Sequence, residues 1–363
     1  MLYRALGKTG LDVSVIGLGC VQLNSSETSY AVQVVQRAVE LGVNYFDVAR
    51  SYGDSEIKLG LGLEGRRQEV FISTKTGAKT RDDAWREINE SLERLRTDYV
   101  DNCHLHGLRL GKDMEQRLGK DGALEALIQA REQGLVRHIG CSSHRSEALV
   151  EALRRFDFEV ILVPMNIVER EPLDELIPLC QHKGVGVTIM KPLATGLLPA
   201  PLALKWLINQ PIASAVPGCT TLEELGENAR VGDGDPALTA QEQGRVEALK
   251  EEWEHRRCRI CSLCQPCPQD ISIGIVLGTD VMYDHYRTMG AQGFRAFAWS
   301  RERIERDLEH RPQTIAAIES CTRCGECEAR CPYGLPVMDM LESVVPAMRD
   351  MVSIYGDVLG SVL

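Results

Sequence analysis

Apolar runs alternate with amphipathic segments along the first 220 residues of the chain. Continuous β-branched runs are typical of strands that are buried on both faces. The segments between the runs place apolar residues at helical spacing, as in residues 82–96 and 123–134. This alternation predicts an α/β fold, a (β/α)8 TIM barrel. Its eight strands are expected over residues 13–19, 45–49, 69–75, 99–106, 136–143, 160–166, 186–193 and 213–218.

A doubly wound open sheet is the alternative, because it also alternates strands with helices. A dinucleotide-binding sheet of that kind carries G-x-G-x-x-G after its first strand. No such motif follows residues 13–19, which favours the barrel. Ahead of this run, the stretch YRALGKTGLDVS has a glycine-bearing turn between two short strands, which predicts a β-hairpin.

The pattern changes after Gly218. Residues 238–256 predict a charged helix with no strand after it. Two cysteine-rich segments follow, separated by a long stretch that is mostly helical in pattern. We therefore expect a domain boundary near residue 250, with the barrel over residues 1–250 and a smaller, mainly α-helical domain over residues 251–363.

Composition narrows the class of protein. Of the 363 residues, 44% are hydrophobic and 26% are charged, which is a normal balance for a soluble globular chain. The net charge of −11 argues against a surface for nucleic acid or for an anionic membrane. We see no secretory signal and no apolar window of membrane-spanning length, so we expect a cytoplasmic protein. Thiols stay reduced there, so the 13 cysteines indicate metal binding or chemistry rather than disulfides.

Four polar residues lie where predicted strands end. Asp47 and Lys75 end the second and third runs, His106 ends the fourth, and Tyr52 follows the second in ARSYG. The carboxyl ends of barrel strands form the usual active site. An ammonium lowers the pKa of a nearby phenol, and a carboxylate keeps that ammonium charged. Each residue alone is more often structural, but the four together predict an acid–base site. Side-chain alternation places His104 on the same face as His106, with His106 nearer the strand end.

The two cysteine-rich segments have the spacing of iron–sulfur ligands. The second segment has C-x2-C-x2-C-x3-C-P, the bacterial ferredoxin spacing for a [4Fe–4S] cluster, and the first is one residue shorter before its last cysteine. Structural zinc is the alternative, but zinc sites usually pair two short ligand clusters across a spacer. In two-cluster ferredoxins the fourth cysteine of each run binds the other cluster. This predicts one cluster on Cys258, Cys261, Cys264 and Cys331, and a second on Cys321, Cys324, Cys327 and Cys267.

The sequence resembles a known family over roughly residues 1–230. The segments GLDVSVIGLG, VNYFDVARSYG, ISTKTG, LRTDYVDNCHLHG, VRHIGCSSH, MKPLATG and SAVPGCTTLEELGEN resemble, in this order, the aldo-keto reductases. The whole chain resembles the subgroup with a C-terminal ferredoxin-like domain carrying two [4Fe–4S] motifs. The resemblance implies hydride transfer between a nicotinamide cofactor and a small carbonyl or alcohol. It makes Tyr52 the general acid, tuned by Lys75 and Asp47, with His106 orienting the carbonyl.

The same resemblance implies a cofactor, NADP or NAD, extended across the strand ends. The segment after the last strand has no Lys or Arg before Arg230, so the choice between NADP and NAD stays open. Ser143 and Leu162 stand where the family often has Asn and Gln. The residues expected to bind the cofactor are Gly19, Cys20, Val21, Asp47, Ser142, Ser143, Asn166, Pro192, Leu193, Gly218, Thr220, Thr221, Glu224 and Asn228.

Three functions fit a hydride-transfer site joined to one-electron clusters. The first is a carbonyl reductase whose clusters are structural or redox-sensing. The second is an electron-transfer oxidoreductase whose clusters exchange electrons with the substrate, an unseen flavin or a redox partner protein. The third is a non-catalytic protein with a relic barrel, which the intact set of four polar residues disfavours. Because the first cysteine segment follows the charged helix at once, we expect the cluster domain to adjoin and cover the active site.

Overall fold

The computed structural model describes residues 1–279, 283 and 301–360. These residues form two compact units, Met1–Leu249 and Lys250–Leu363, and each is described by itself. Most of the stretch expected to link the two cysteine segments, residues 280–282 and 284–300, lies outside the described residues.

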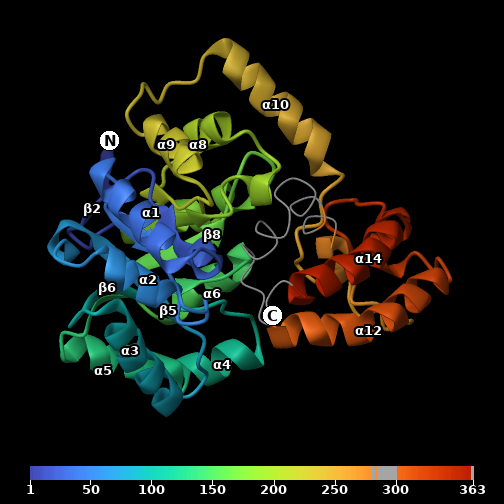
Figure 1. Cartoon of the computed structure of the whole chain (residues 1–363), viewed down its shortest axis with the longest axis horizontal. Coiled ribbons are helices and arrows are strands. Elements are labelled where there is room, and N and C mark those ends of the chain that lie inside the picture. Colours follow the sequence, from blue (N-terminus) through green and yellow to red (C-terminus); the bar gives the residue numbers. More distant parts are fainter. Residues whose placement is uncertain (280–282, 284–300, 361–363) are drawn as a thin grey trace. The chain divides into compact units, whose positions relative to one another are not determined.

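The first unit contains eight parallel strands that pair strictly in chain order. Helices lie outside these strands (Figure 1). Two bridges, Ile16 to Ala215 and Gly19 to Gly218, join the first edge of the sheet to the last. The (β/α)8 prediction is therefore confirmed, and the doubly wound alternative is wrong because its strand order is not sequential. The strands are β3 (Leu18–Gly19), β4 (Tyr45–Asp47), β5 (Phe71–Thr76), β6 (Val100–Leu105), β7 (Val136–Ser142), β8 (Val160–Pro164), β9 (Gly186–Met190) and β10 (Ser214–Ala215).

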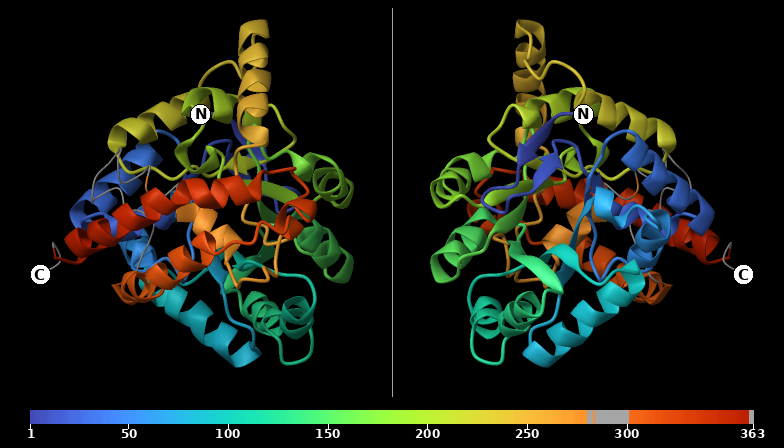
Figure 2. Two further views of the ribbon diagram at one scale, coloured as in Figure 1. Left: turned by 90° about the vertical axis from the view of Figure 1, so that its right-hand side faces the viewer. Right: turned by 90° about the vertical axis from the view of Figure 1, so that its left-hand side faces the viewer.

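The predicted hairpin is confirmed as β1 (Tyr3–Ala5) paired antiparallel with β2 (Asp12–Ser14). The expected first barrel strand over residues 13–19 is too long, because its start belongs to this hairpin. The reason is packing: Val13 and Leu6 are fully buried against Tyr45 and Val160, the first residues of two barrel strands. The hairpin thus covers the amino ends of the strands (Figure 2).

Helix caps account for where the barrel helices begin and end. Thr80 accepts a hydrogen bond from the backbone of Asp83 at the start of α3, and Thr221 and Glu224 form a reciprocal capping box at α9. Gly184 takes a left-handed conformation after α7. The helices are α1 (Thr28–Glu40), α2 (Ser55–Gly62), α3 (Arg81–Leu95), α4 (Lys112–Leu118), α5 (Ala123–Glu132), α6 (Ser146–Arg155), α7 (Leu176–Lys183), α8 (Ala200–Ile208) and α9 (Leu222–Val231).

The charged helix expected over residues 238–256 is confirmed as α10 (Ala240–Glu254), which runs across the boundary between the units. The second unit is helical over residues 273–279 and in α12 (Arg301–Glu319), α13 (Glu326–Ala329) and α14 (Val337–Gly360). Its core buries Ile273, Ile318 and Leu341, and all eight clustered cysteines belong to this core or pack against it, except Cys261 and Cys324. Within the described chain, no helix combines the length and apolarity that a membrane crossing needs.

Candidate functional site

The four predicted acid–base residues meet at the carboxyl ends of the strands. Asp47 ends β4, Lys75 lies in β5, His106 follows β6, and Tyr52 lies in the loop between β4 and α2. Lys75 Nζ donates to Asp47 Oδ1 at 2.6 Å and to the backbone carbonyl of Val48 at 2.6 Å. The same nitrogen lies 5.0 Å from the centroid of the Tyr52 ring. The rings of Tyr52 and His106 meet edge to face, with centroids 5.9 Å apart.

Burial and charge set the protonation of this group. Burial raises the pKa of Asp47, against the attraction of Lys75. Burial also lowers the pKa of Lys75, but the attraction of Asp47 and then Tyr52 outweighs it, so the net shift is upward. The result is an ammonium that stays charged beside its carboxylate.

The two ring side chains are both neutral at physiological pH. Burial raises the pKa of Tyr52, and Lys75 opposes that rise. Burial, helped by the charge of Lys75, lowers the pKa of His106 to about 3. A neutral phenol above an ammonium can give up a proton and have the remaining charge stabilised. A neutral imidazole can donate a hydrogen bond to an oxygen placed between them.

Ser142 and Ser143 are bound to the loop that follows His106. The hydroxyl of Ser142 accepts a hydrogen bond from the backbone N–H of Gly107 at 2.9 Å. The hydroxyl of Ser143 donates to the backbone carbonyl of Leu108 at 2.7 Å. Both serines therefore hold the loop that begins at His106, whatever else they contact.

The side chain of Asn166 forms hydrogen bonds with neighbouring loop residues. Its amide nitrogen donates to Glu169 Oε2 at 2.7 Å and to the carbonyl of Lys191 at 3.2 Å. Its amide oxygen accepts from the backbone of Val168 and Glu169. The structure thus places Asn166 at the mouth of the barrel but uses all of its polar atoms locally.

The remaining residues expected to bind the cofactor lie at or beside the carboxyl ends of β3, β9 and β10. Pro192 and Leu193 lie in a loop where Lys191, Ala194 and Thr195 all have positive φ. Such backbone conformations cost free energy for residues other than glycine, and they concentrate at functional sites. The expected residues beside β3 and β10 are Gly19, Cys20, Val21, Gly218, Thr220, Thr221, Glu224 and Asn228.

Asn228 and Glu224 differ in how many of their side-chain polar atoms already have hydrogen-bond partners within the protein. Glu224 Oε2 accepts from the backbone and hydroxyl of Thr220 at 2.7 and 2.8 Å. Asn228 is buried and donates to Cys219 Sγ, but its Oδ1 atom has no hydrogen-bond partner in the described chain. An unpaired buried acceptor is costly unless a ligand or water completes it.

In the second unit, cysteines from both segments line one cavity. Cys267 of the first segment lines it together with the first three cysteines of the second, Cys321, Cys324 and Cys327. Cys331 of the second segment lies near Cys258 of the first, because after burial it contributes, with Cys261, to raising the pKa of Cys258. The last cysteine of each segment is thus brought near the other segment.

Comparison with known proteins identifies the barrel. The family described as aldo/keto reductase matches residues 15–200, which is just over half of the chain. The chain belongs to the aldo/keto reductase family. A second family, described as a 4Fe-4S dicluster domain, matches residues 257–336 and supports iron–sulfur clusters in this chain. That match decides against the zinc alternative for the two cysteine segments.

Several relatives resemble the barrel part of the chain. An uncharacterized oxidoreductase of Bacillus subtilis, YqkF, is 31% identical over 54% of this chain and 67% of its own length. An L-galactose dehydrogenase of Arabidopsis thaliana is 35% identical over 54% of this chain and 66% of its own length. A solved aldo-keto reductase of Bacillus halodurans matches with a TM-score of 0.60 and 27% identity. The aligned part covers 69% of this chain and 96% of that chain.

A further solved structure shares the fold. It is an aldo/keto reductase of Klebsiella pneumoniae in complex with NADP and acetate, with a TM-score of 0.60 and 23% identity. The aligned part covers 69% of this chain and 96% of the Klebsiella pneumoniae chain.

Arg117 was not expected near the candidate site. Its side chain is buried and donates from Nη1 to the carbonyl of His106 at 2.8 Å and from Nη2 to the carbonyl of Thr76 at 3.0 Å. It therefore joins the ends of β5 and β6, where Lys75 and His106 lie. Nothing in the sequence marks it, because an arginine in a helix is usually exposed.

His104 lies in β6, two residues before His106. It lies in register with Lys75 on one side and with Gly140 on the other. A Cβ atom at Gly140 would lie 2.4 Å from His104 Nδ1, so glycine is needed there. The ring is fully buried. Burial and then Lys75 lower the pKa of His104 well below its ordinary value.

Proposed function

We propose that the barrel catalyses NAD(P)H-dependent hydride transfer to or from a small carbonyl or alcohol, with Tyr52 as the general acid and base. The observation that carries this proposal is the close arrangement of Asp47, Lys75 and Tyr52. An ammonium fixed by a buried carboxylate lies 5.0 Å from the phenol ring. Family membership supports the same reaction class.

The strand ends fit a nicotinamide cofactor. Asp47 Oδ2 and Asn228 Oδ1 are buried acceptors without a hydrogen-bond partner in the described residues, and both lie at this end of the barrel. Gly19 and Gly218 bring two backbones together there without side chains. When bound, the cofactor supplies or accepts the hydride. The other predicted residues would line its extended path across the strand ends.

The chain's own residues account for the proton. In the reducing direction, Tyr52 donates its phenolic proton to the oxygen of the substrate carbonyl. Lys75 stabilises the phenolate that remains, and Asp47 keeps Lys75 in place. His106, which is neutral, donates a hydrogen bond to the same oxygen and orients it. In the oxidising direction, Tyr52 takes the proton back.

The test is a Tyr52→Phe variant assayed with a simple aromatic aldehyde and either NADPH or NADH. We expect kcat to fall about 100-fold or more, the usual scale for loss of a general acid, while the Kd of the cofactor changes little. Tyr99→Phe is the matched control, because the Tyr99 hydroxyl bonds to Gln68 and not to the four residues. Full activity in Tyr52→Phe would contradict the proposal. Comparing NADPH with NADH settles the cofactor.

We also propose that the second unit holds two [4Fe–4S] clusters with exchanged fourth ligands. The cavity shared by Cys267 and the second segment supports one half of this exchange. The other half rests on the ferredoxin spacing, since Cys331 lies near Cys258 and Cys264 but Cys327 also lies near Cys264. Each cluster would then be held by both segments, so the two segments would close into a single small unit.

Single substitutions distinguish exchanged from local ligation. In the exchanged arrangement, the EPR spectrum of reduced Cys331→Ser should match that of Cys258→Ser, and the spectrum of Cys267→Ser should match that of Cys324→Ser. Local ligation would pair Cys331→Ser with Cys324→Ser instead. Iron analysis of each variant serves as the control for cluster content.

An electron-transfer oxidoreductase remains a second candidate, because a domain that carries one-electron clusters lies in the same chain. In that function the clusters adjoin the active site and exchange electrons with the substrate, a flavin or a redox partner protein. Cys327→Ser tests it in the full chain. A wild-type rate of NAD(P)H-dependent aldehyde reduction would make the clusters structural or sensing, whereas a lost reaction with an intact barrel would place them on the path of electrons.

A further inference from the structure

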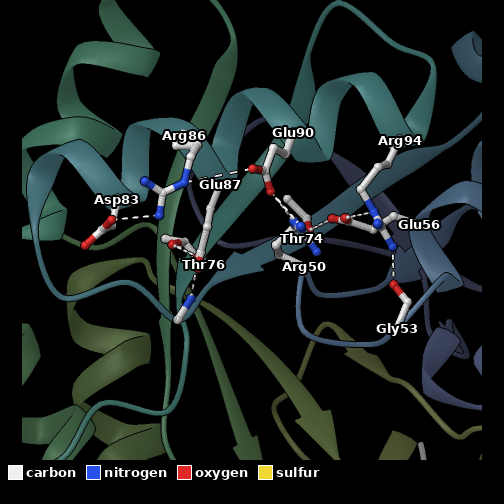
Figure 3. A network of polar contacts seen from close by, with 11 residues as sticks. Arg50, Gly53, Glu56, Thr74, Thr76, Asp83, Arg86, Glu87, Glu90 and Arg94 are labelled. Atoms are coloured by element: carbon white, nitrogen blue, oxygen red, sulfur yellow. Dashed lines mark hydrogen bonds and ion pairs between the residues drawn. The ribbon is translucent and has the colours of Figure 1, made fainter. Parts of the chain in front are cut away.

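The loop that carries Tyr52 is attached to helix α3 on both sides of the tyrosine (Figure 3). Before the tyrosine, Arg50 donates from Nε and Nη2 to Glu90 Oε2 at 2.8 and 2.6 Å. After it, the backbone carbonyl of Gly53 accepts a hydrogen bond from Arg94 Nη2. Glu90 and Arg94 are four residues apart in α3, so they lie on one face of the helix.

Arg94 is itself held by a buried carboxylate. Its Nε atom lies 3.2 Å from Oε2 of Glu56, whose side chain is fully buried. The other carboxylate oxygen of Glu56 accepts from the hydroxyl of Thr74 at 2.7 Å. Thr74 directly precedes Lys75 in β5. A buried carboxylate is stable only with a cation or hydrogen-bond donors beside it, so this ion pair, although not a hydrogen bond, favours a guanidinium of Arg94 that stays close to Glu56.

The opposite side of the loop is closed by Asn24. Its Oδ1 atom accepts a hydrogen bond from the backbone N–H of Asp54 at 3.1 Å. Gly53 has φ of +54°, and a Cβ atom there would lie 1.7 Å from Asn24 Oδ1. Only glycine permits this close approach. The peptide between Gly53 and Asp54 is therefore held from both sides: its carbonyl accepts from Arg94, and its N–H donates to Asn24 Oδ1.

We propose that Arg94, seated on Glu56, is a positioning residue that fixes Tyr52 over Lys75 through the carbonyl of Gly53, with the Arg50–Glu90 pair as its second anchor. This proposal rests on the role of Tyr52 as general acid and adds residues outside the four. A displacement of about 1 Å at a catalytic group can cost about 100-fold in rate, so an anchor on this loop acts on kcat rather than on binding.

The experiment compares Arg94→Met with Arg94→Lys in the full chain, using NAD(P)H-dependent reduction of an aromatic aldehyde. We expect Arg94→Met to lower kcat by about 10- to 100-fold with a change in cofactor Kd of less than about 2-fold. Arg94→Lys should recover part of the loss, because lysine can still donate to Gly53. Arg81→Met is the matched control: it removes a cation from the same helix, where Arg81 bonds to Gln129, and should leave kcat unchanged.

Two readouts separate positioning from a general structural role. In a Tyr52→Phe background, Arg94→Met should cause no further loss of kcat, because its effect passes through the tyrosine. In the variant with Tyr52 intact, the basic limb of the kcat–pH profile should move to higher pH, because a phenol farther from Lys75 is a weaker acid. An unmoved pH profile, a wild-type kcat, or a loss that adds in full to that of Tyr52→Phe would each overturn the proposal.

A second variant keeps the test open if Arg94→Met does not fold. Glu90→Gln removes the charge that anchors Arg50, along with a longer 3.9 Å ion pair to the exposed Arg86, and leaves the Arg94–Gly53 bond in place. It should lower kcat by about 3- to 10-fold, less than Arg94→Met because Gly53 stays bound. Unchanged kcat in a folded Glu90→Gln would overturn the role of the second anchor. If Tyr52→Phe itself is fully active, the proposed function is wrong. That outcome is distinct from a failure of the positioning role alone, in which Tyr52→Phe loses activity but Arg94→Met does not.

Discussion

Asp47 and Asp101 are two buried carboxylates in one barrel, but the protein satisfies them differently. Asp101 lies in β6 near its amino end and has a donor for each oxygen. Its Oδ1 accepts from Arg137 at 3.0 Å, and its Oδ2 accepts from Arg67 at 2.8 Å and from the backbone of Ile72 at 2.9 Å. Both guanidinium groups also stack on the ring of Tyr99.

Asp47, at the opposite end of the strands, is satisfied only in part. One oxygen accepts from Lys75, and the other has no hydrogen-bond partner in the described chain. The partly exposed ring of Tyr52 lies beside this pair. A complete set of partners makes a buried charge rigid and inert, whereas an incomplete set leaves capacity for a ligand. The comparison indicates that the closed end of the barrel serves stability and the open end serves chemistry.

The largest effect on activity is expected at Lys75, at the open end of the barrel. Lys75→Met removes the ammonium that stabilises the Tyr52 phenolate, so kcat for aldehyde reduction should fall about 100-fold or more. The measurement is steady-state kinetics on the folded variant, with circular dichroism to confirm the fold. Retained activity would mean that the incomplete pair at the mouth is not catalytic.

The converse variant at the closed end is Asp101→Asn. It leaves two arginines without their carboxylate, so the free energy of unfolding should fall by about 3–5 kcal/mol. Urea denaturation measures this loss, and kcat per folded molecule should stay at the wild-type value. A variant that keeps its stability but loses activity would reverse the roles that we assign to the two ends.

A pH-dependent effect is expected at His104. Its pKa is lowered in the folded protein by burial and by Lys75, while the unfolded chain has the ordinary value of about 6.5. Below about pH 6.5 the unfolded chain binds a proton that the folded protein does not, so stability falls as the pH is lowered. Relative to His104→Gln, the wild-type protein should lose up to about 1.4 kcal/mol per pH unit below pH 6. Parallel denaturation curves of the two proteins across pH 4.5–7 would contradict this.

The smallest effect is expected at Arg137, whose side chain is 47% exposed. In Arg137→Gln, Asp101 keeps Arg67 and the backbone N–H of Ile72. The loss in unfolding free energy should therefore be about 1 kcal/mol or less. A loss as large as that of Asp101→Asn would show that both arginines are needed together.

Sequence patterns predicted the parts of the molecule that depend on periodicity. The eight strands follow from apolar runs, and the meeting of Asp47, Lys75 and His106 follows because strand ends share one mouth. The division of residues 13–19 between hairpin and barrel did not follow, because both parts are apolar and only packing against Tyr45 separates them.

The supporting residues escaped prediction for a physical reason. Arg94 reaches a carbonyl 41 residues away in the chain, and Arg117 reaches one 41 residues away in β5. Contacts of this kind depend on the conformation of a long side chain and on where two helices pack, which no local spacing records. The serines at 142 and 143 were expected to face a cofactor, and their bonds to Gly107 and Leu108 likewise depend on a loop conformation.

The seam where the barrel closes has a consequence for motion. β3 and β10 are each two residues long, and the sheet edges meet there through the bridges at Ile16 and Gly19. Few backbone hydrogen bonds hold this line, so we expect local opening there to cost little free energy. A ligand that contacts both Gly19 and Gly218 ties the two edges together. The N–H groups of Gly17, Gly19 and Ala215 bond across the seam. Their rate of amide hydrogen exchange should therefore fall when a ligand is bound at this end of the barrel.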